Sequence, residues 1–440
     1  MTTKEKLELG HWVAEQSRKA GADDAAVAIS FSRNVTVQSK NHQLDELKEA
    51  TSNSLGIEIY AAGRYSSHST CDLSRDGLAK FVAEAVAMTK YLSPDPDRVI
   101  TDPKYYQGRR DMDLKQYDPY YDKVTSQERV EIARECEEGA YKHDSRVVAC
   151  TGYYGDSLTE FVRVHTNGFE GTVRSTDFGA YTYATVRGDS DQRPADWCEY
   201  DGCFFKPMTA ADVLAKEAVA RAARNLGQAK MASGRYDMIV DNRAMSRLLG
   251  AMASPLGGAS LYRKNSFLDG KLGEKIGSDK FTVIDDPFVE SGLGSRLFDG
   301  DGMAAQRRVI FDKGVLKNYF IDYYYGRKLK MEPTSGGTSN VIFEYGDKSL
   351  DDMIAAVDKG ILVTSFVGGN SNDTTGDFSY GIIGQYVEGG KIVRPVNEMN
   401  ISGNFMQLWN QLVEVGNDPY PYSSNRRPSM HFRDIDFAGL

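Results

Sequence analysis

Two pairs of aspartates have the type and spacing for acid–base chemistry. Asp285 and Asp286 are adjacent, and Asp299 and Asp301 stand one glycine apart in the segment FDGDG. Two carboxyl groups that face each other can act as general acid and general base in a hydrolysis. FDGDG also resembles the start of a calcium loop, but the remaining EF-hand ligands do not follow it. We expect a tight turn at FDGDG and exposed turn carboxylates at both pairs.

Side chains that bind zinc or act as nucleophiles are scarce. The cysteines are odd in number and lack CxxC spacing, which predicts reduced, buried thiols; they are Cys71, Cys136, Cys150, Cys198 and Cys203. After Cys203 the chain has no cysteine and one histidine, His431. A zinc site built from histidine and cysteine is therefore excluded from the second half. His165 is interpreted as a polar residue at a strand end, and no GxSxG nucleophile elbow occurs.

A glycine-rich polar loop is a second candidate for a binding site. Residues 368–377 (GGNSNDTTGD) form a polar loop whose amides could line a cleft. The loop has neither the Lys-Ser/Thr ending of a P-loop nor a strand–turn–helix context, so it predicts no nucleotide site.

The first half alternates helical and strand patterns. Apolar spacing predicts helices over Lys4–Arg18, from Ser74 to the prolines at 94 and 96, over Thr125–Tyr141 with a capping box to Glu128, and over Thr209–Leu226. Strands are predicted at Ala25–Phe31 and Ser54–Tyr60, and Asn167-Gly168 predicts a hairpin turn. Residues 93–123 read as a long connection.

The second half is predicted to be mostly β. Its main helix is expected over Asp241–Met252, with Asp241 or Asn242 as N-cap and Met245, Leu248, Leu249 and Met252 on one buried face. This helix breaks at Pro255–Gly258. Short helices are predicted at 323–329 and 350–358, and strands at 309–316, 379–387 and 391–393.

Length and composition favour an α+β protein with two domains. A chain of 440 residues is too long for one ordinary core. We predict an N-terminal α/β portion over residues 1–230, with a division into two sub-lobes near 95–124, and a β-rich C-terminal domain over residues 231–440.

Several motifs resemble the TldD/PmbA family, the so-called modulators of DNA gyrase. They fall in family order over nearly the whole chain: YRKNSF at 262–267, RLFDGDG at 296–302, GVLKNY at 314–319 and VGND at 415–418. The resemblance implies the fold of that family and a role in proteolysis.

The family has two kinds of subunit, and this chain is similar to the TldE/PmbA kind. The TldD kind carries HExxxH on the helix described above, and counting back from Arg263 places that motif on residues 250–255. Gly250, Ala251 and Pro255 then occupy the positions of the two ligands and the general base. These residue types cannot hold a metal or activate water, so the resemblance implies a vacated site with no metal and no cofactor.

The vacated site leaves a surface suited to contact. We expect Arg263, Lys264, Gly257, Gly258, Gly368 and Gly369 to contact an extended peptide. The family resemblance implies a TldD-like metalloprotease subunit as partner, and a homodimer when that partner is absent.

Two other functions stay open at this point: a self-associating peptide-binding scaffold without a catalytic partner, and an independent hydrolase that uses carboxylates. A net charge of −9 and a pI near 5.4 oppose nucleic-acid binding, and Arg426-Arg427 is too short for a basic patch. The N-terminus lacks the apolar core of a signal peptide and no apolar run is long enough to span a bilayer. We expect a cytoplasmic protein.

Overall fold

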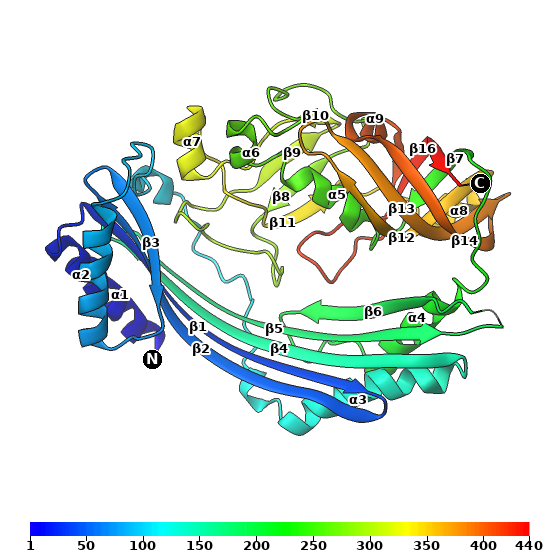
Figure 1. Ribbon diagram of the computed structural model, residues 1–440, viewed down its shortest axis with the longest axis horizontal. Coiled ribbons are helices and arrows are strands. Elements are labelled where there is room, and N and C mark those ends of the chain that lie inside the picture. The colour runs from blue at the N-terminus through cyan, green and yellow to red at the C-terminus, as the bar shows by residue number, and fades with distance from the viewer. Residues whose placement is uncertain (190, 440) are drawn as a thin grey trace.

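A computed structural model describes residues 1–189 and 191–439. A long curved sheet forms one side of the molecule, and the C-terminal region lies over its concave side (Figure 1). The architecture is α+β, as predicted. No helix among the described residues is long and apolar enough to cross a membrane.

The first sheet has six antiparallel strands in the order β3-β2-β1-β4-β5-β6. Their bounds are β1 Asp24–Lys40, β2 Gln43–Ala61, β3 Arg64–Thr70, β4 Val147–His165, β5 Glu170–Val186 and β6 Ala195–Gly202. Because β1 pairs with both β2 and β4, strands from before and after the long connection share one sheet.

The two predicted strands in β1 and β2 are confirmed but continue well beyond their predicted ends. The first half of β2, residues 43–53, is exposed throughout, so its side chains show no alternation of buried and exposed positions. An apolar period therefore could not reveal it. The hairpin at Asn167-Gly168 is confirmed, with Gly168 at φ +103° between β4 and β5.

Helices cover the convex side of this sheet at its two ends (Figure 1). Helices α1 (Thr3–Lys19) and α2 (Arg75–Thr89) pack on β1 and β2, and helices α3 (Ser126–His143) and α4 (Ala211–Ala223) pack on β4–β6. The capping box between Thr125 and Glu128 is present. Gly152 on β4 permits the close approach of α3, because a Cβ there would lie 2.0 Å from a backbone oxygen of α3.

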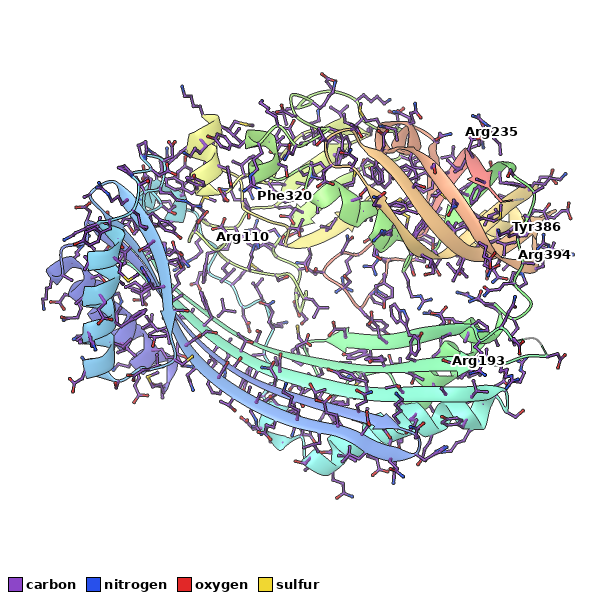
Figure 2. The ribbon with its side chains drawn as sticks, in the orientation of Figure 1. Arg110, Arg193, Arg235, Phe320, Tyr386 and Arg394 are labelled. Carbon is purple, nitrogen blue, oxygen red and sulfur yellow. The ribbon has the colours of Figure 1, made fainter. Side chains whose placement is uncertain are left out.

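The long connection runs between the two parts of the molecule. It contains only two short 3-10 turns, Pro103–Tyr106 and Tyr121–Lys123. Its backbone is bonded to the C-terminal region, since Ala304 donates to the carbonyl of Tyr105 at 2.8 Å. Arg110, labelled in Figure 2, places its guanidinium 3.9 Å from the centroid of the Phe288 ring.

The C-terminal region contains two sheets. One has the order β14-β13-β12-β7-β16-β15 and is closed by pairing of β14 with β16; the other has the order β10-β9-β8-β11. The bounds are β7 Gly234–Val240, β8 Val283–Asp286, β9 Arg308–Asp312, β10 Val315–Leu316, β11 Asn340–Phe343, β12 Lys359–Ser371, β13 Asp377–Glu388, β14 Lys391–Asn404, β15 Leu412–Val415 and β16 Met430–Ala438. The predicted strands are confirmed as parts of β9, β10, β13 and β14.

Five helices are described in this region, namely α5 Met245–Ala253, α6 Gly258–Tyr262, α7 Tyr323–Leu329, α8 Leu350–Ala355 and α9 Phe405–Asn410. A large core of aromatic and aliphatic side chains joins α5, α6, α7 and α9 to both sheets, with Trp409 stacked on Phe281 at 4.4 Å between ring centroids. The buried residues of α8 lie in a separate, smaller cluster. The boundary predicted between residues 230 and 231 lies in the segment between α4 and β7, and it stays a prediction, as does the division near 95–124.

Candidate functional site

The helix at the centre of the predicted site is α5, and it begins later than predicted. Its first turn is preceded by an Asp241 turn, in which the Asp241 carboxylate accepts the backbone N–H groups of Arg243 and Ala244, each at 2.9 Å. Asp241 therefore caps a turn instead of the helix itself, which starts at Met245. The local hydrogen bonds of the aspartate compete with the helical ones.

One face of α5 is buried in the core, as predicted. Met245 and Leu248 are fully buried and Met252 nearly so, while Leu249 is partly buried against the same core. The indole N–H of Trp409 lies 3.2 Å from the sulfur of Met252. This anchoring fixes the opposite face of the helix at the surface.

The positions of the vacated motif have different surroundings. Gly250 is exposed, and a Cβ built on it would have no atom within 4 Å. Ala251 is partly buried against the core, and Pro255 is buried, with its carbonyl accepting the Ser266 hydroxyl at 2.6 Å. None of the three carries a metal-binding atom. Among the described residues, no group of three or more His, Cys, Asp or Glu side chains is placed to hold a metal ion.

The glycine junction after α5 is a backbone pairing site within the protein. Gly258 donates to the carbonyl of Phe320 at 2.9 Å, and Phe320 donates to Leu256 at 2.9 Å. A Cβ on Gly258 would lie 2.7 Å from the Cβ of Tyr325, so this glycine permits close packing of α6 on α7. Gly257 forms a parallel β-bridge with Phe320 as part of the same backbone pairing.

The other residues predicted to contact peptide lie on two connected segments. Arg263 and Lys264 are exposed, and the Lys264 ammonium lies 2.9 Å from Asp269. Gly368 and Gly369 form a bulge in β12, with φ of +61° and +71°.

These segments are tied to α5 and to each other. The Arg247 guanidinium donates to the carbonyls of Gly368 and Gly369, at 3.3 and 2.9 Å. Phe267, shortly after Lys264, donates its N–H to the carbonyl of Asp373 at 2.8 Å. The polar glycine loop and the segment after α6 are therefore neighbours.

A small apolar cavity of about 130 Å³ lies beside the exposed face of α5. The helical side of its lining consists of Leu249, Gly250, Met252, Ala253 and Leu256. The opposite side consists of Phe281, Val283, Ile310, Phe311, Phe320, Thr338, Val341, Phe343, Ser424 and Asn425. Phe320 is labelled in Figure 2, near α6. The cavity therefore adjoins the first position of the vacated motif.

A second cavity, of about 530 Å³, lies between the start of α5 and strand β6 of the first sheet. Arg243 lines it from the turn before α5 and Arg247 from α5 itself, while Asp196 and Trp197 line it from β6. The Arg243 guanidinium bonds to the Asp196 carboxylate at 3.0 Å and to the Trp197 carbonyl at 2.7 Å. Burial lowers the pKa of the nearby Arg224, opposed by the charges of Asp241 and Asp196.

The aspartate pairs of the sequence do not form a catalytic pair. Asp285 accepts the N–H and hydroxyl of Ser339, at 2.5 and 2.8 Å, and Asp286 bonds to Arg307 at 3.1 Å. The expected exposure is wrong for Asp285 and Asp299, both buried, because each satisfies backbone N–H groups inside the fold. Asp286 and Asp301 are partly buried, and the first pair lies in strand β8 instead of a turn.

FDGDG is the predicted tight turn. Asp299 accepts the N–H groups of Asp301 and Met303, each at 3.0 Å, and Gly302 has φ +80°. Burial, assisted by the Asp299 charge, raises the pKa of Asp301 to about 6. The carboxylate of Asp301 accepts the N–H of Tyr323 at 3.0 Å, which ties this turn to the start of α7.

His165 and His431 are both held by structural hydrogen bonds. Nδ1 of His165 lies 2.8 Å from the Tyr106 hydroxyl, and Arg163 donates to its Nε2 at 2.8 Å. Burial, followed by the Arg163 charge, lowers the pKa of His165 to about 3. His431 bonds to Asp237 at 3.0 Å. Among the cysteines, all unpaired, Cys136, Cys150 and Cys203 are buried as expected, Cys198 is partly buried, and Cys71 is exposed.

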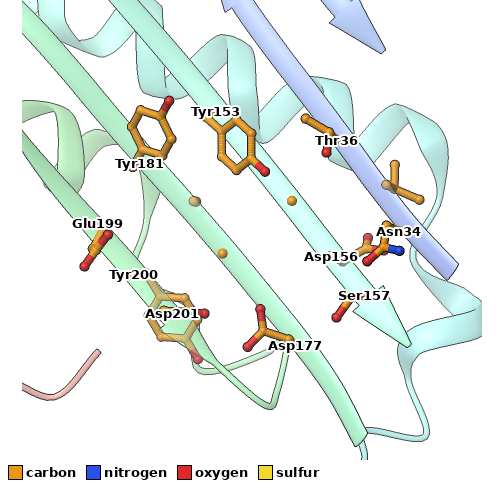
Figure 3. A pocket seen from close by; sticks show the side chains of 14 residues that line it. Asn34, Thr36, Tyr153, Asp156, Ser157, Asp177, Tyr181, Glu199, Tyr200 and Asp201 are labelled. Atoms are coloured by element: carbon orange, nitrogen blue, oxygen red, sulfur yellow. The ribbon is translucent and has the colours of Figure 1, made fainter. Parts of the chain in front are cut away.

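A carboxyl pair that was not among the predicted site residues lies on the concave face of the first sheet. Asp177 on β5 and Asp201 on β6 are hydrogen-bonded to each other in a cavity of about 360 Å³ (Figure 3). Burial, followed by the charge of Asp177, raises the pKa of Asp201 to about 8. Tyr153 and Tyr181 stack beside them at 4.8 Å between centroids. Only the β5–β6 register brings the two aspartates together, so no spacing in the sequence signals the pair.

Family models for three domains match this chain. They are described as PmbA/TldA metallopeptidase domain 1 at residues 25–89, the central domain at 119–226 and the C-terminal domain at 233–439. Among curated relatives, the metalloprotease PmbA of Escherichia coli O157:H7 is 28% identical over 426 residues, which cover 95% of this chain and 93% of that protein.

Solved structures are also similar to this chain over nearly its whole length. A candidate modulator of DNA gyrase from Bacteroides thetaiotaomicron VPI-5482 is 41% identical, with a TM-score of 0.97 and 100% of both chains covered. TldE from Thermococcus kodakarensis shares the fold, with a TM-score of 0.89 at 21% identity over 98% of this chain and 100% of that one. The chain therefore belongs to the PmbA/TldD metallopeptidase family, a family of proteolytic proteins.

Proposed function

We propose that this chain is a subunit of the TldE/PmbA kind, without a catalytic metal site, that acts with a TldD-like metalloprotease on extended or unfolded peptides. The observation that carries the proposal is the set of side chains at Gly250, Ala251 and Pro255. A zinc hydrolase needs nitrogen, sulfur or carboxylate donors and a base that activates water. These three residues supply none of them.

The scarcity of ligand side chains in the second half of the chain supports the same role. His431, the one histidine after Cys203, is engaged with Asp237 on β7 and has no second histidine or cysteine in this half of the chain to share an ion with. The relatives named PmbA and TldE cover nearly the whole chain, which favours pairing with a TldD-like subunit.

We assign peptide contact to the exposed part of the predicted surface. Arg263 and Lys264 present cationic groups, and the bulge at Gly368 and Gly369 is exposed beside Arg247. Gly257 and Gly258 support this surface through their pairing with Phe320. An extended peptide can bond to exposed backbone groups and ion-pair with such side chains.

Co-purification tests the proposal. The chain, co-expressed with a TldD-like subunit, is expected to form a mixed complex that cleaves an unstructured peptide and loses activity in a chelator. Each subunit alone provides the control. Absence of a mixed complex, together with unchanged cleavage by the TldD-like subunit when this chain is omitted, would contradict the proposal.

An independent hydrolase that uses carboxylates is the second candidate. The observation that favours it is the hydrogen-bonded pair of Asp177 and Asp201, in which a protonated carboxyl could act as acid and the other as base. Peptide hydrolysis by the purified chain in a chelator, abolished in Asp201→Asn, would establish it and replace the first proposal.

A further inference from the structure

The apolar cavity beside α5 has a rim and a floor of different character. Its floor is formed by buried rings and branched chains, among them Phe281, Phe311 and Phe343. Its rim includes Gly250, Ala253 and Thr338, which are exposed. Because a Cβ at Gly250 would meet no atom within 4 Å, the cavity is open beside this residue.

The size of the cavity suits one side chain. An apolar cavity of about 150 Å³ lined by aliphatic and aromatic groups is large enough to bind benzene. The cavity here measures about 130 Å³, so it accommodates one ring or one branched aliphatic group. A charged group is disfavoured, because the floor has no polar partner that would offset its lost hydration.

One polar atom in the lining has no partner. The side-chain oxygen of Asn425 is buried and has no hydrogen bond to any described residue. Asn425 and Ser424 stand in the lining next to Val341, whose N–H donates to the Ser424 carbonyl at 2.9 Å. Ser424 and Asn425 therefore form a polar side of an otherwise largely apolar lining.

The volume, the apolar floor and the polar side of this cavity match one apolar residue of a peptide. An apolar side chain would fill the floor, while the peptide backbone next to it would lie at the polar side of the cavity, formed by Ser424 and Asn425. We propose that this cavity is a specificity pocket that takes an aromatic or branched aliphatic side chain of the extended peptide. The inference rests on the proposed function for the identity of the ligand, and it assigns to the vacated site a selective role.

The test measures binding to the isolated chain. Methyl-labelled methionine NMR reports on Met252, which lines the cavity. The probes are the blocked tripeptides acetyl-Gly-Phe-Gly-amide, acetyl-Gly-Ala-Gly-amide and acetyl-Gly-Lys-Gly-amide, together with toluene. We expect the phenylalanine peptide to shift the Met252 methyl signal saturably, with an affinity at least tenfold above that of the alanine and lysine peptides.

Matched variants test whether the phenylalanine peptide binds in this cavity. Gly250→Leu, which also raises helix propensity, is expected to weaken the phenylalanine peptide at least tenfold by filling the open side of the cavity. Ser254→Leu, exposed nearby but outside the lining, is expected to bind as the unmodified chain does. Ala253→Leu is a second filling variant if Gly250→Leu does not fold. Equal binding by a folded filling variant would overturn the proposal.

Two further outcomes would also overturn it. One is a Met252 signal that no tripeptide shifts. The other is a site that takes toluene but not the phenylalanine peptide, which would identify a pocket for small apolar molecules. These binding measurements need no partner subunit, so their failure is distinguishable from failure to form a mixed complex or to cleave peptide.

Discussion

Arg243 and Asp196 form a buried ion pair that joins the C-terminal region to the first sheet. Nη2 of Arg243, in the turn before α5, lies 3.0 Å from the Asp196 carboxylate on β6, with side-chain exposures of 5% and 11%. The Arg243 guanidinium also lies over the Trp197 ring, 4.6 Å from its centroid. The start of the helix that carries the vacated motif is thus fixed by residues almost 50 positions earlier in the chain.

Removal of one partner of this pair should lower the free energy of unfolding. Asp196→Ala leaves a buried guanidinium without its counter-charge and is expected to lower the free energy of unfolding by about 3 kcal/mol. Urea unfolding followed by circular dichroism measures it. The control is Asp436→Ala, which breaks an exposed pair with Arg235 and should cost at most ~1 kcal/mol. Equal losses in the two variants would show that the buried pair does not stabilise the contact.

Because one face of α5 is buried, truncation of a leucine on that face should cost more stability than truncation of an exposed leucine. Leu248→Ala opens a cavity in the aromatic core and should reduce the free energy of unfolding by roughly 3 kcal/mol. The same substitution at Leu272, which is 49% exposed, should change it by less than about 0.5 kcal/mol. Comparison of the two urea midpoints provides the measurement. A Leu248→Ala variant as stable as the unmodified chain would place this face of α5 outside the core.

The Asp177–Asp201 pair should make stability fall as pH rises. In the folded chain the pKa of Asp201 is raised to about 8, so the folded state keeps a proton that the unfolded state releases near pH 4. The stability contributed by this proton is complete below pH 4 and is lost as pH rises to about 8.

Asp201→Asn removes this dependence. Relative to the unmodified chain, its melting temperature should rise between pH 5 and pH 8.5, by about 2 °C or more at the higher pH. The exposed Asp436→Asn serves as control and should show no such trend. A constant difference between Asp201→Asn and the unmodified chain across this range would mean that Asp201 holds no extra proton.

Metal content follows from the side chains at the vacated motif. The purified chain should contain far less than one zinc per chain, because Gly250, Ala251 and Pro255 offer no ligand atoms. Elemental analysis after dialysis against zinc and then against buffer checks this. About one zinc per chain would require a site elsewhere and would contradict the proposed subunit type.

The isolated chain should associate with itself. If the exposed surface around α5 and α6 normally meets a partner, we expect a homodimer of about twice 48.8 kDa at micromolar concentration. Light scattering measures the mass, and addition of a TldD-like subunit should replace the homodimer by a mixed dimer. A monomer that ignores this subunit would leave the association without support.

The sequence by itself determined the local features of this protein. Capping residues such as Thr125, the turn at Asn167-Gly168 and the apolar spacing within α5 act over a few residues, so the short-range pattern predicts them. The types of side chain at Gly250 and Pro255 likewise need no fold to show that they lack ligand atoms. Motif order alone was enough to indicate the family that the domain models then established.

Only the tertiary structure decided which distant residues meet. The exposed first half of β2 has no apolar period, so its pairing with β1 fixes it as a strand. The β5–β6 register joins Asp177 to Asp201, and the approach of the turn before α5 to β6 joins Arg243 to Asp196. Such contacts depend on long-range pairing free energies that no local spacing encodes. The apolar cavity beside Gly250 arises in the same way, from residues that span positions 249 to 425.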